Sequence, residues 1–88
     1  MTTKTITVQN RAGIHARPSS LIVQTASKFQ SNITIEKDSL TINAKSIMGI
    51  MTMAAGYKTE LIISADGADE DEALAALEQL FISKFEEE

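Results

Sequence analysis

The chain of 88 residues contains no cysteine, and this absence constrains its fold more than any other feature. A chain of this length buries only about 60–65% of the surface that its unfolded form exposes, which leaves a small domain little stability to spare. Disulfide bonds and thiolate metal sites are both excluded, so stability has to come from a compact apolar core. Hydrophobic residues make up 43% of the sequence, enough for one core in a single domain spanning residues 1–88.

The hydrophobic periodicity changes several times along the chain, which predicts an alternation of strands and helices. The expected elements are a strand at 2–8, a helix from Ala16 to about Phe29, hairpin strands at 33–36 and 40–42, a short helix at 47–53 that Gly56 ends, a strand at 61–65 and a last helix opening at 69–72. Four short strands and two long helices fit an α+β open-faced sandwich of order βαββαβα, an antiparallel sheet covered on one face. In the last helix, Asp69 and Glu72 are expected to form a capping-box variant.

Charge and composition exclude several function classes. The formal net charge of −4 and the scarcity of aromatic residues argue against nucleic-acid binding, including an RNA-binding α+β domain with aromatic side chains on its sheet. The apolar runs are too short for a membrane span, and the N-terminus lacks the apolar stretch of a signal peptide. We therefore expect a cytoplasmic protein without a cofactor.

The only histidine, His15, lies in the segment Gly13-Ile-His-Ala-Arg-Pro-Ser-Ser20. Pro18 fits the first turn of the helix that follows, which places His15 at or next to the N-cap. Helix starts present N–H groups and a positive dipole end to anions, and a neutral imidazole is a nucleophile toward phosphorus. Arg17 can bind phosphate oxygens with two N–H groups.

From these residues alone, His15 is either a phosphoryl acceptor or a passive surface residue. A metal site is disfavoured because no second histidine or thiol is present as a co-ligand. Hydrolysis by a Ser-His-Asp set lacks a supporting G-x-S-x-G segment.

Ser46 precedes the short helix at 47–53, and on local sequence its favoured interpretation is a helix N-cap. The five apolar residues of this helix exceed what one face can bury, so Ile50 and Met53 are expected to face the core. Exposed methionines suit adaptable contacts with several partners. The expected exposed patch beside His15 comprises Ile47, Met48 and Met51.

The segment G-I-H-A-R-P at 13–18, after a predicted strand and before an amphipathic helix, resembles the active-site signature of the HPr family of histidine-containing phosphocarrier proteins. A second segment, K-S-I-M-G at 45–49, resembles the family's regulatory-serine segment, and the likeness covers the whole chain. The resemblance implies a stoichiometric carrier, not an enzyme. In the phosphoenolpyruvate-dependent sugar phosphotransferase system (PTS), His15 would accept a phosphoryl group on Nδ1 from phospho-enzyme I and pass it to sugar-specific enzyme II A components.

The same resemblance assigns roles to the neighbouring residues. Arg17 would steady the phosphoryl group, and the backbone amides of Ala16 and Arg17 would donate hydrogen bonds to it. Ser46 would be phosphorylated by HPr kinase/phosphorylase, with a catabolite-control transcription regulator as a further candidate partner. The apolar patch would contact enzyme I, the A domains and the kinase, and the protein would be a monomer.

Two points qualify the family pattern. Ala12 replaces the small polar residue that family members commonly carry three positions before the histidine, so no side-chain hydrogen bond is expected from this position. A mainly regulatory relative or corepressor acting through Ser46 is the alternative function, and the presence of His15 favours the carrier. The tail Glu86–Glu88 is expected to fray, with a contact to Arg17 left open.

Overall fold

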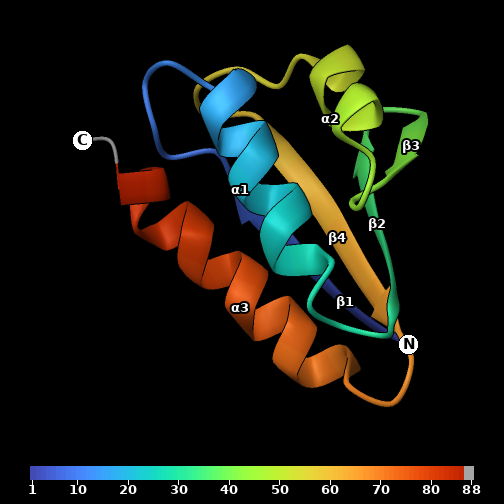
Figure 1. The fold of residues 1–88 in the computed structure, drawn as a ribbon. Helices are drawn as coiled ribbons and strands as arrows, with labels where there is room; N and C mark the ends of the chain where they lie inside the picture. The colour runs from blue at the N-terminus through green and yellow to red at the C-terminus, as the bar shows by residue number, and fades with distance from the viewer. Residues whose placement is uncertain (87–88) are drawn as a thin grey trace.

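The strand and helix patterns of the sequence are realised in the computed structural model, which describes residues 1–86 (Figure 1). In chain order the elements are β1 (Thr2–Thr7), α1 (Ala16–Ala26), β2 (Asn32–Lys37), β3 (Leu40–Asn43), α2 (Ile47–Met53), β4 (Glu60–Asp66), α3 (Glu70–Ile82) and a 3-10 turn, η1 (Lys84–Glu86). The expected α+β open-faced sandwich of order βαββαβα is confirmed.

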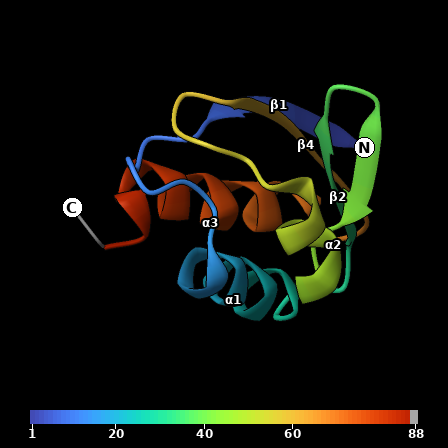
Figure 2. The ribbon, with the colours of Figure 1, turned by 90° about the horizontal axis from the view of Figure 1, so that it is seen from above.

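The four strands form one antiparallel sheet of order β1-β4-β2-β3. Ile6 on β1 lies opposite Leu61 on β4, and Ile35 on β2 lies opposite Ile63 on β4. Because side chains alternate along a strand, these registers gather the apolar residues on one face. Figure 2 shows α1 and α3 lying side by side against that face of the sheet.

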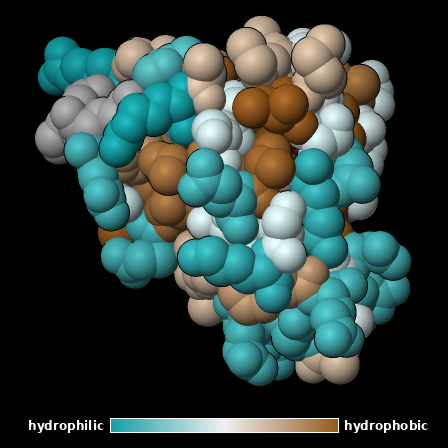
Figure 3. Space-filling model, in the orientation of Figure 1, coloured by the Kyte–Doolittle hydropathy of each residue, from teal (hydrophilic) through white to brown (hydrophobic). Residues whose placement is uncertain are grey.

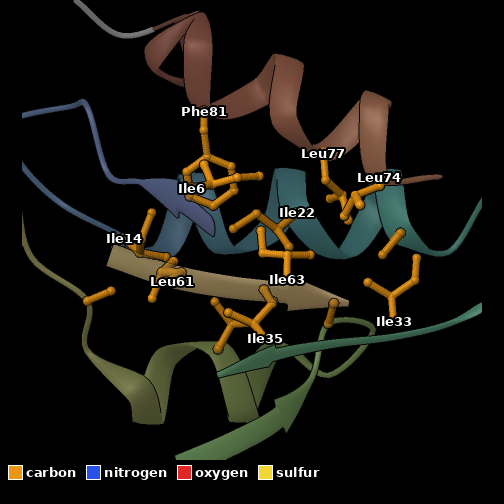
Figure 4. Packing of buried hydrophobic residues seen from close by; sticks show 14 of the residues in the cluster. Ile6, Ile14, Ile22, Ile33, Ile35, Leu61, Ile63, Leu74, Leu77 and Phe81 are labelled. Carbon is orange, nitrogen blue, oxygen red and sulfur yellow. The ribbon is translucent and has the colours of Figure 1, made fainter. Parts of the chain in front are cut away.

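The core fills the space between the sheet and the helices (Figure 4). Ile22 comes from α1, and Leu77 and Phe81 come from α3, all at most 1% exposed. They pack onto the apolar face of the strands in one continuous cluster. This cluster supplies the stabilisation that a chain without disulfides needs.

One helix ends earlier than the sequence indicated, and another is followed by a different residue in the left-handed conformation than expected. α1 stops at Ala26, because the N–H groups of Lys28 and Phe29 bond carbonyls three residues back and turn the chain toward β2. α2 ends at Met53, which confirms the predicted range, but the residue that takes the left-handed conformation after it is Ala54 (φ 52°), not Gly56.

The prediction of a capping box at the start of α3 is wrong, because the Asp69 side chain makes no capping hydrogen bond. Its carboxylate instead accepts hydrogen bonds from the backbone of Gln30 (2.9 Å) and from the backbone and hydroxyl of Ser31, in the turn that precedes β2. The Ser31 hydroxyl, followed by the Gln30 N–H, lowers the pKa of Asp69. Asp69 therefore ties the α1–β2 turn to the beginning of α3.

Part of the frayed tail expected from the sequence is ordered. Glu86 belongs to η1, and its N–H bonds the Ser83 carbonyl at 2.9 Å. The remaining tail positions, 87–88, lie outside the described residues.

Candidate phosphoryl-acceptor site

His15 is the N-cap residue of α1, as the sequence predicted, and it is exposed. Its backbone is extended (φ −98°, ψ −161°), and its carbonyl accepts hydrogen bonds from the Ser19 N–H (2.9 Å) and the Ser19 hydroxyl (2.7 Å). Ser19 and Pro18 are buried beneath it. These hydrogen bonds hold the backbone of His15 in place, while the residue itself is exposed at the surface.

The loop before His15 is held by a second loop, residues 54–59, which no sequence pattern linked to the site. The Ile14 N–H bonds the Ala55 carbonyl at 2.8 Å, and the two loops also bond through Val8 and Lys58 at 2.9 Å. Gly13 has a left-handed φ of +76°, and a Cβ there would lie 2.8 Å from the Ala55 oxygen. The site therefore needs glycine at this position for conformation and for space.

The first residues of α1 meet the requirements of an anion site. Ala16 and Arg17 are exposed, and they occupy the first two helical positions, whose N–H groups have no acceptor within a helix. Pro18 follows at the third position, where its missing N–H costs no helical hydrogen bond. Two backbone donors and the positive end of the helix dipole thus lie next to His15 in the chain.

Arg17 is held by the opposite end of the chain. Its Nη1 donates a hydrogen bond of 2.9 Å to the Phe85 carbonyl, 68 residues away in sequence. The acceptor is the backbone carbonyl of the residue just before the Glu86–Glu88 tail, so the contact between Arg17 and the tail itself stays a prediction. In the sequence, the helical spacing of Phe81 and Phe85 was the available signal for this contact. Spacing alone does not reveal that the chain turns between these two residues.

Ser46 caps α2, which confirms the local interpretation of the sequence. Its Oγ accepts a hydrogen bond of 3.1 Å from the Gly49 N–H. Lys45, beside it, donates from Nζ to the Phe29 carbonyl at 2.8 Å and so joins this helix start to the turn after α1.

The division of the α2 side chains into core and surface is also confirmed. Ile50 and Met53 are at most 3% exposed, and the exposed set is Ile47 (41%), Met48 (72%) and Met51 (46%). Figure 3 shows apolar surface gathered over α2. Figures 1 and 2 place α2 beside α1, at the end of the molecule where α1 begins.

Neither metal ligation nor a membrane span finds support in residues 1–86. That range holds no group of three or more His, Cys, Asp or Glu side chains placed to bind a metal ion. No helix in it is both long enough and apolar enough to cross a membrane.

Comparison with known proteins identifies the family. A family model described as "PTS HPr component phosphorylation site" matches residues 2–83. The phosphocarrier protein HPr of Treponema pallidum is 57% identical over 88 residues, which cover 100% of both chains. The crystal structure of HPr-C-His from Thermoanaerobacter tengcongensis has a TM-score of 0.96 and 52% identity, covering 100% of this chain and 99% of that one.

A third relative is the Bacillus subtilis catabolite repression protein Crh, whose structure is described as a swapped dimer. It has a TM-score of 0.72 and 41% identity, covering 100% of this chain and 97% of its own. The fold and the matched model define a component of the phosphotransferase system. The chain belongs to the HPr family, the phosphocarrier proteins of that system. The monomeric state expected from the sequence stays a prediction.

Proposed function

We propose that this protein accepts a phosphoryl group on Nδ1 of His15 from phospho-enzyme I and delivers it to A components of sugar-specific enzyme II. The observation that carries the proposal is the exposed His15 at the N-cap of α1, next to the N–H groups of Ala16 and Arg17. The Nδ1 lone pair forms the new nitrogen–phosphorus bond, and the electron pair of the broken bond stays with the donor atom. Delivery to the next acceptor reverses this exchange at Nδ1.

The environment of His15 favours a carrier because it stabilises the phosphoryl group only moderately. An exposed anion gains about 0.3–1 kcal/mol from a helix N-terminus. Arg17 adds a guanidinium that binds phosphate oxygens through paired N–H donors. This modest stabilisation lets the group be held between encounters and still be passed on.

The apolar patch of Ile47, Met48 and Met51 is the proposed docking surface for enzyme I, the A domains and the kinase. Support comes from the exposure of all three residues and from the position of α2 beside the start of α1. Methionine side chains adapt to differently shaped partners, so one patch can serve several. A carrier needs such shared surfaces because each partner has to leave before the next one docks.

Ser46 is the proposed regulatory site, phosphorylated by HPr kinase/phosphorylase, with a catabolite-control transcription regulator as a candidate reader. A phosphate would add about −1.5 to −2 charges. Its oxygens can replace Oγ as acceptors at the helix start, so α2 is expected to persist. The new charge beside the apolar patch would instead weaken docking of acidic partners. We place the protein and these partners in the cytoplasm.

A mainly regulatory role is the second candidate, favoured by the 41% identity to the catabolite repression protein Crh. In that case Ser46 would carry the signal and His15 would not transfer phosphate. The acceptor histidine with its glycine, arginine and proline neighbours favours the carrier. The two candidates differ in whether phosphoenolpyruvate and enzyme I label the protein.

One transfer experiment separates these possibilities. The wild type, His15→Ala and Ser46→Ala are each incubated with phosphoenolpyruvate and enzyme I, and separately with ATP and the kinase. We expect an acid-labile phosphate that only His15→Ala loses, and an acid-stable phosphate that only Ser46→Ala loses. Normal acid-labile labelling of His15→Ala would overturn the assignment of the acceptor.

A further inference from the structure

The segment that follows α3 has an unusual backbone. Lys84, Phe85 and Glu86 have φ values of 55°, 56° and 61°, so three consecutive residues with a Cβ adopt the left-handed conformation. Such residues persist there only where the surrounding structure holds them. The Glu86 N–H closes the turn onto the Ser83 carbonyl, but one backbone hydrogen bond does not account for three strained residues.

The Phe85 side chain supplies the anchor for this turn. It is fully buried, and its ring packs edge-on against Phe81 with centroids 4.9 Å apart and planes at 67°. Burial of an aromatic ring is among the largest favourable terms available to one residue, and edge-to-face contact adds to it. The ring thus stabilises a turn that the backbone alone disfavours.

The turn delivers the Phe85 carbonyl to Arg17. Figures 1 and 2 show that α3 runs antiparallel to α1, so the end of α3 lies near the start of α1. Arg17 Nη1 donates to the Phe85 oxygen at 2.9 Å in a partly buried contact. A guanidinium has five N–H donors, so this bond fixes the orientation of the group and leaves other donors for an anion.

We propose that Phe85 is a positioning residue for phosphoryl transfer, which acts through Arg17. Its buried ring holds the left-handed turn, the turn aims the carbonyl, and the carbonyl orients the guanidinium toward phosphoryl oxygens on His15. The inference rests on the proposed acceptor role of His15. Its physical reason is that a long, exposed arginine side chain otherwise samples many rotamers and loses that freedom only when the anion arrives.

The kinetic test is a double-mutant cycle on kcat/KM for phosphoryl transfer from enzyme I. Phe85→Ala should lower kcat/KM about three- to tenfold, as expected for a charge-assisted hydrogen bond that is weakened. In Arg17→Ala, adding Phe85→Ala should change kcat/KM less than twofold, because Phe85 has no other route to the reaction. Phe85→Leu keeps a buried apolar side chain and should restore most of the rate.

The control is Leu74→Ala, which removes a buried side chain from the first half of α3, away from η1. It should lower the unfolding midpoint in urea as Phe85→Ala does, yet leave kcat/KM at the wild-type value. Equal loss of rate in Leu74→Ala, or independent multiplying effects of Phe85→Ala and Arg17→Ala, would overturn the proposal.

A second measurement does not depend on phosphoryl transfer. The heteronuclear NOE of the Arg17 Nε–Hε group reports the order of the guanidinium in the unphosphorylated protein. It should fall in Phe85→Ala and stay high in Leu74→Ala and Phe85→Leu. An unchanged NOE in folded Phe85→Ala would overturn the positioning role even if His15 is labelled normally. A wild type that enzyme I fails to label would overturn the proposed function instead, whatever the NOE shows.

Discussion

Replacing Gly13 by alanine tests whether the two loops at the start of α1 position His15. Gly13 lies two residues before the histidine in a left-handed conformation, and the next N–H, that of Ile14, bonds the Ala55 carbonyl. An added methyl group would meet the Ala55 oxygen at 2.8 Å and the Gly56 Cα at 3.1 Å, and both are backbone atoms that no rotamer change can move. The loops would have to separate.

The expected loss of stability has two parts. The left-handed conformation costs a residue with a Cβ about 1–2 kcal/mol. Weakening the hydrogen bond between Ile14 and Ala55 removes up to about 0.5–1.5 kcal/mol. Together these lower the free energy of unfolding by about 1.5–3.5 kcal/mol, equivalent to a fall in Tm of about 6–28 °C for a domain of this size.

Urea unfolding followed by far-ultraviolet circular dichroism measures this difference. Gly56→Ala is the matched control, because a Cβ at Gly56 meets nothing within 4 Å. It should change the free energy of unfolding by less than about 0.5 kcal/mol, as surface substitutions usually do. If Gly13→Ala is as stable as Gly56→Ala, the contact between the loops is not what holds the approach to His15.

Three further predictions concern other parts of the molecule. Ser46→Ala removes the cap on Gly49 and should cost about 1 kcal/mol in urea unfolding; an unchanged midpoint would contradict the capping role. The Ser31 hydroxyl lowers the pKa of Asp69, so this stabilisation is full above the ordinary value of 3.8 and is lost as the pH falls through the lowered value. The destabilisation caused by Asp69→Asn should therefore shrink between pH 7 and pH 2, and a constant difference would contradict the contact. Met48→Ala should leave stability unchanged and raise KM for transfer from enzyme I, whereas an unchanged KM would exclude Met48 from docking.

Most of the fold was predictable because its signals are local. Period-two alternation located the strands, and helical spacing with Pro18 located the start of α1. The exposure of the α2 residues followed from a simple count, since a helix of seven residues cannot bury five apolar side chains on one face. The histidine and the serine at two helix starts were recognised for the same reason, because capping depends on a few adjacent residues.

The features that the sequence did not reveal depend on contacts between distant segments. Asp69 has the spacing of a capping box, but the N–H groups of Gln30 and Ser31, 38 or more residues away, bind its carboxylate instead. The hydrogen bond between Arg17 and Phe85 likewise depends on how α1 and α3 pack. It also depends on the left-handed turn at 84–86, which contains no glycine that would indicate it in the sequence. Local rules predict which groups are available, whereas tertiary packing decides which of them meet.

The proposed function requires phosphate bound at Nδ1 of His15, and NMR of the 15N-histidine-labelled protein measures this directly. His15 is the only histidine, so the imidazole signals need no assignment among sites. After incubation with phosphoenolpyruvate and enzyme I, the Nδ1 resonance should shift and show coupling to phosphorus, while Nε2 keeps its proton. Phosphorus coupling at Nε2, or full labelling of the protein with both imidazole nitrogens unchanged, would contradict it.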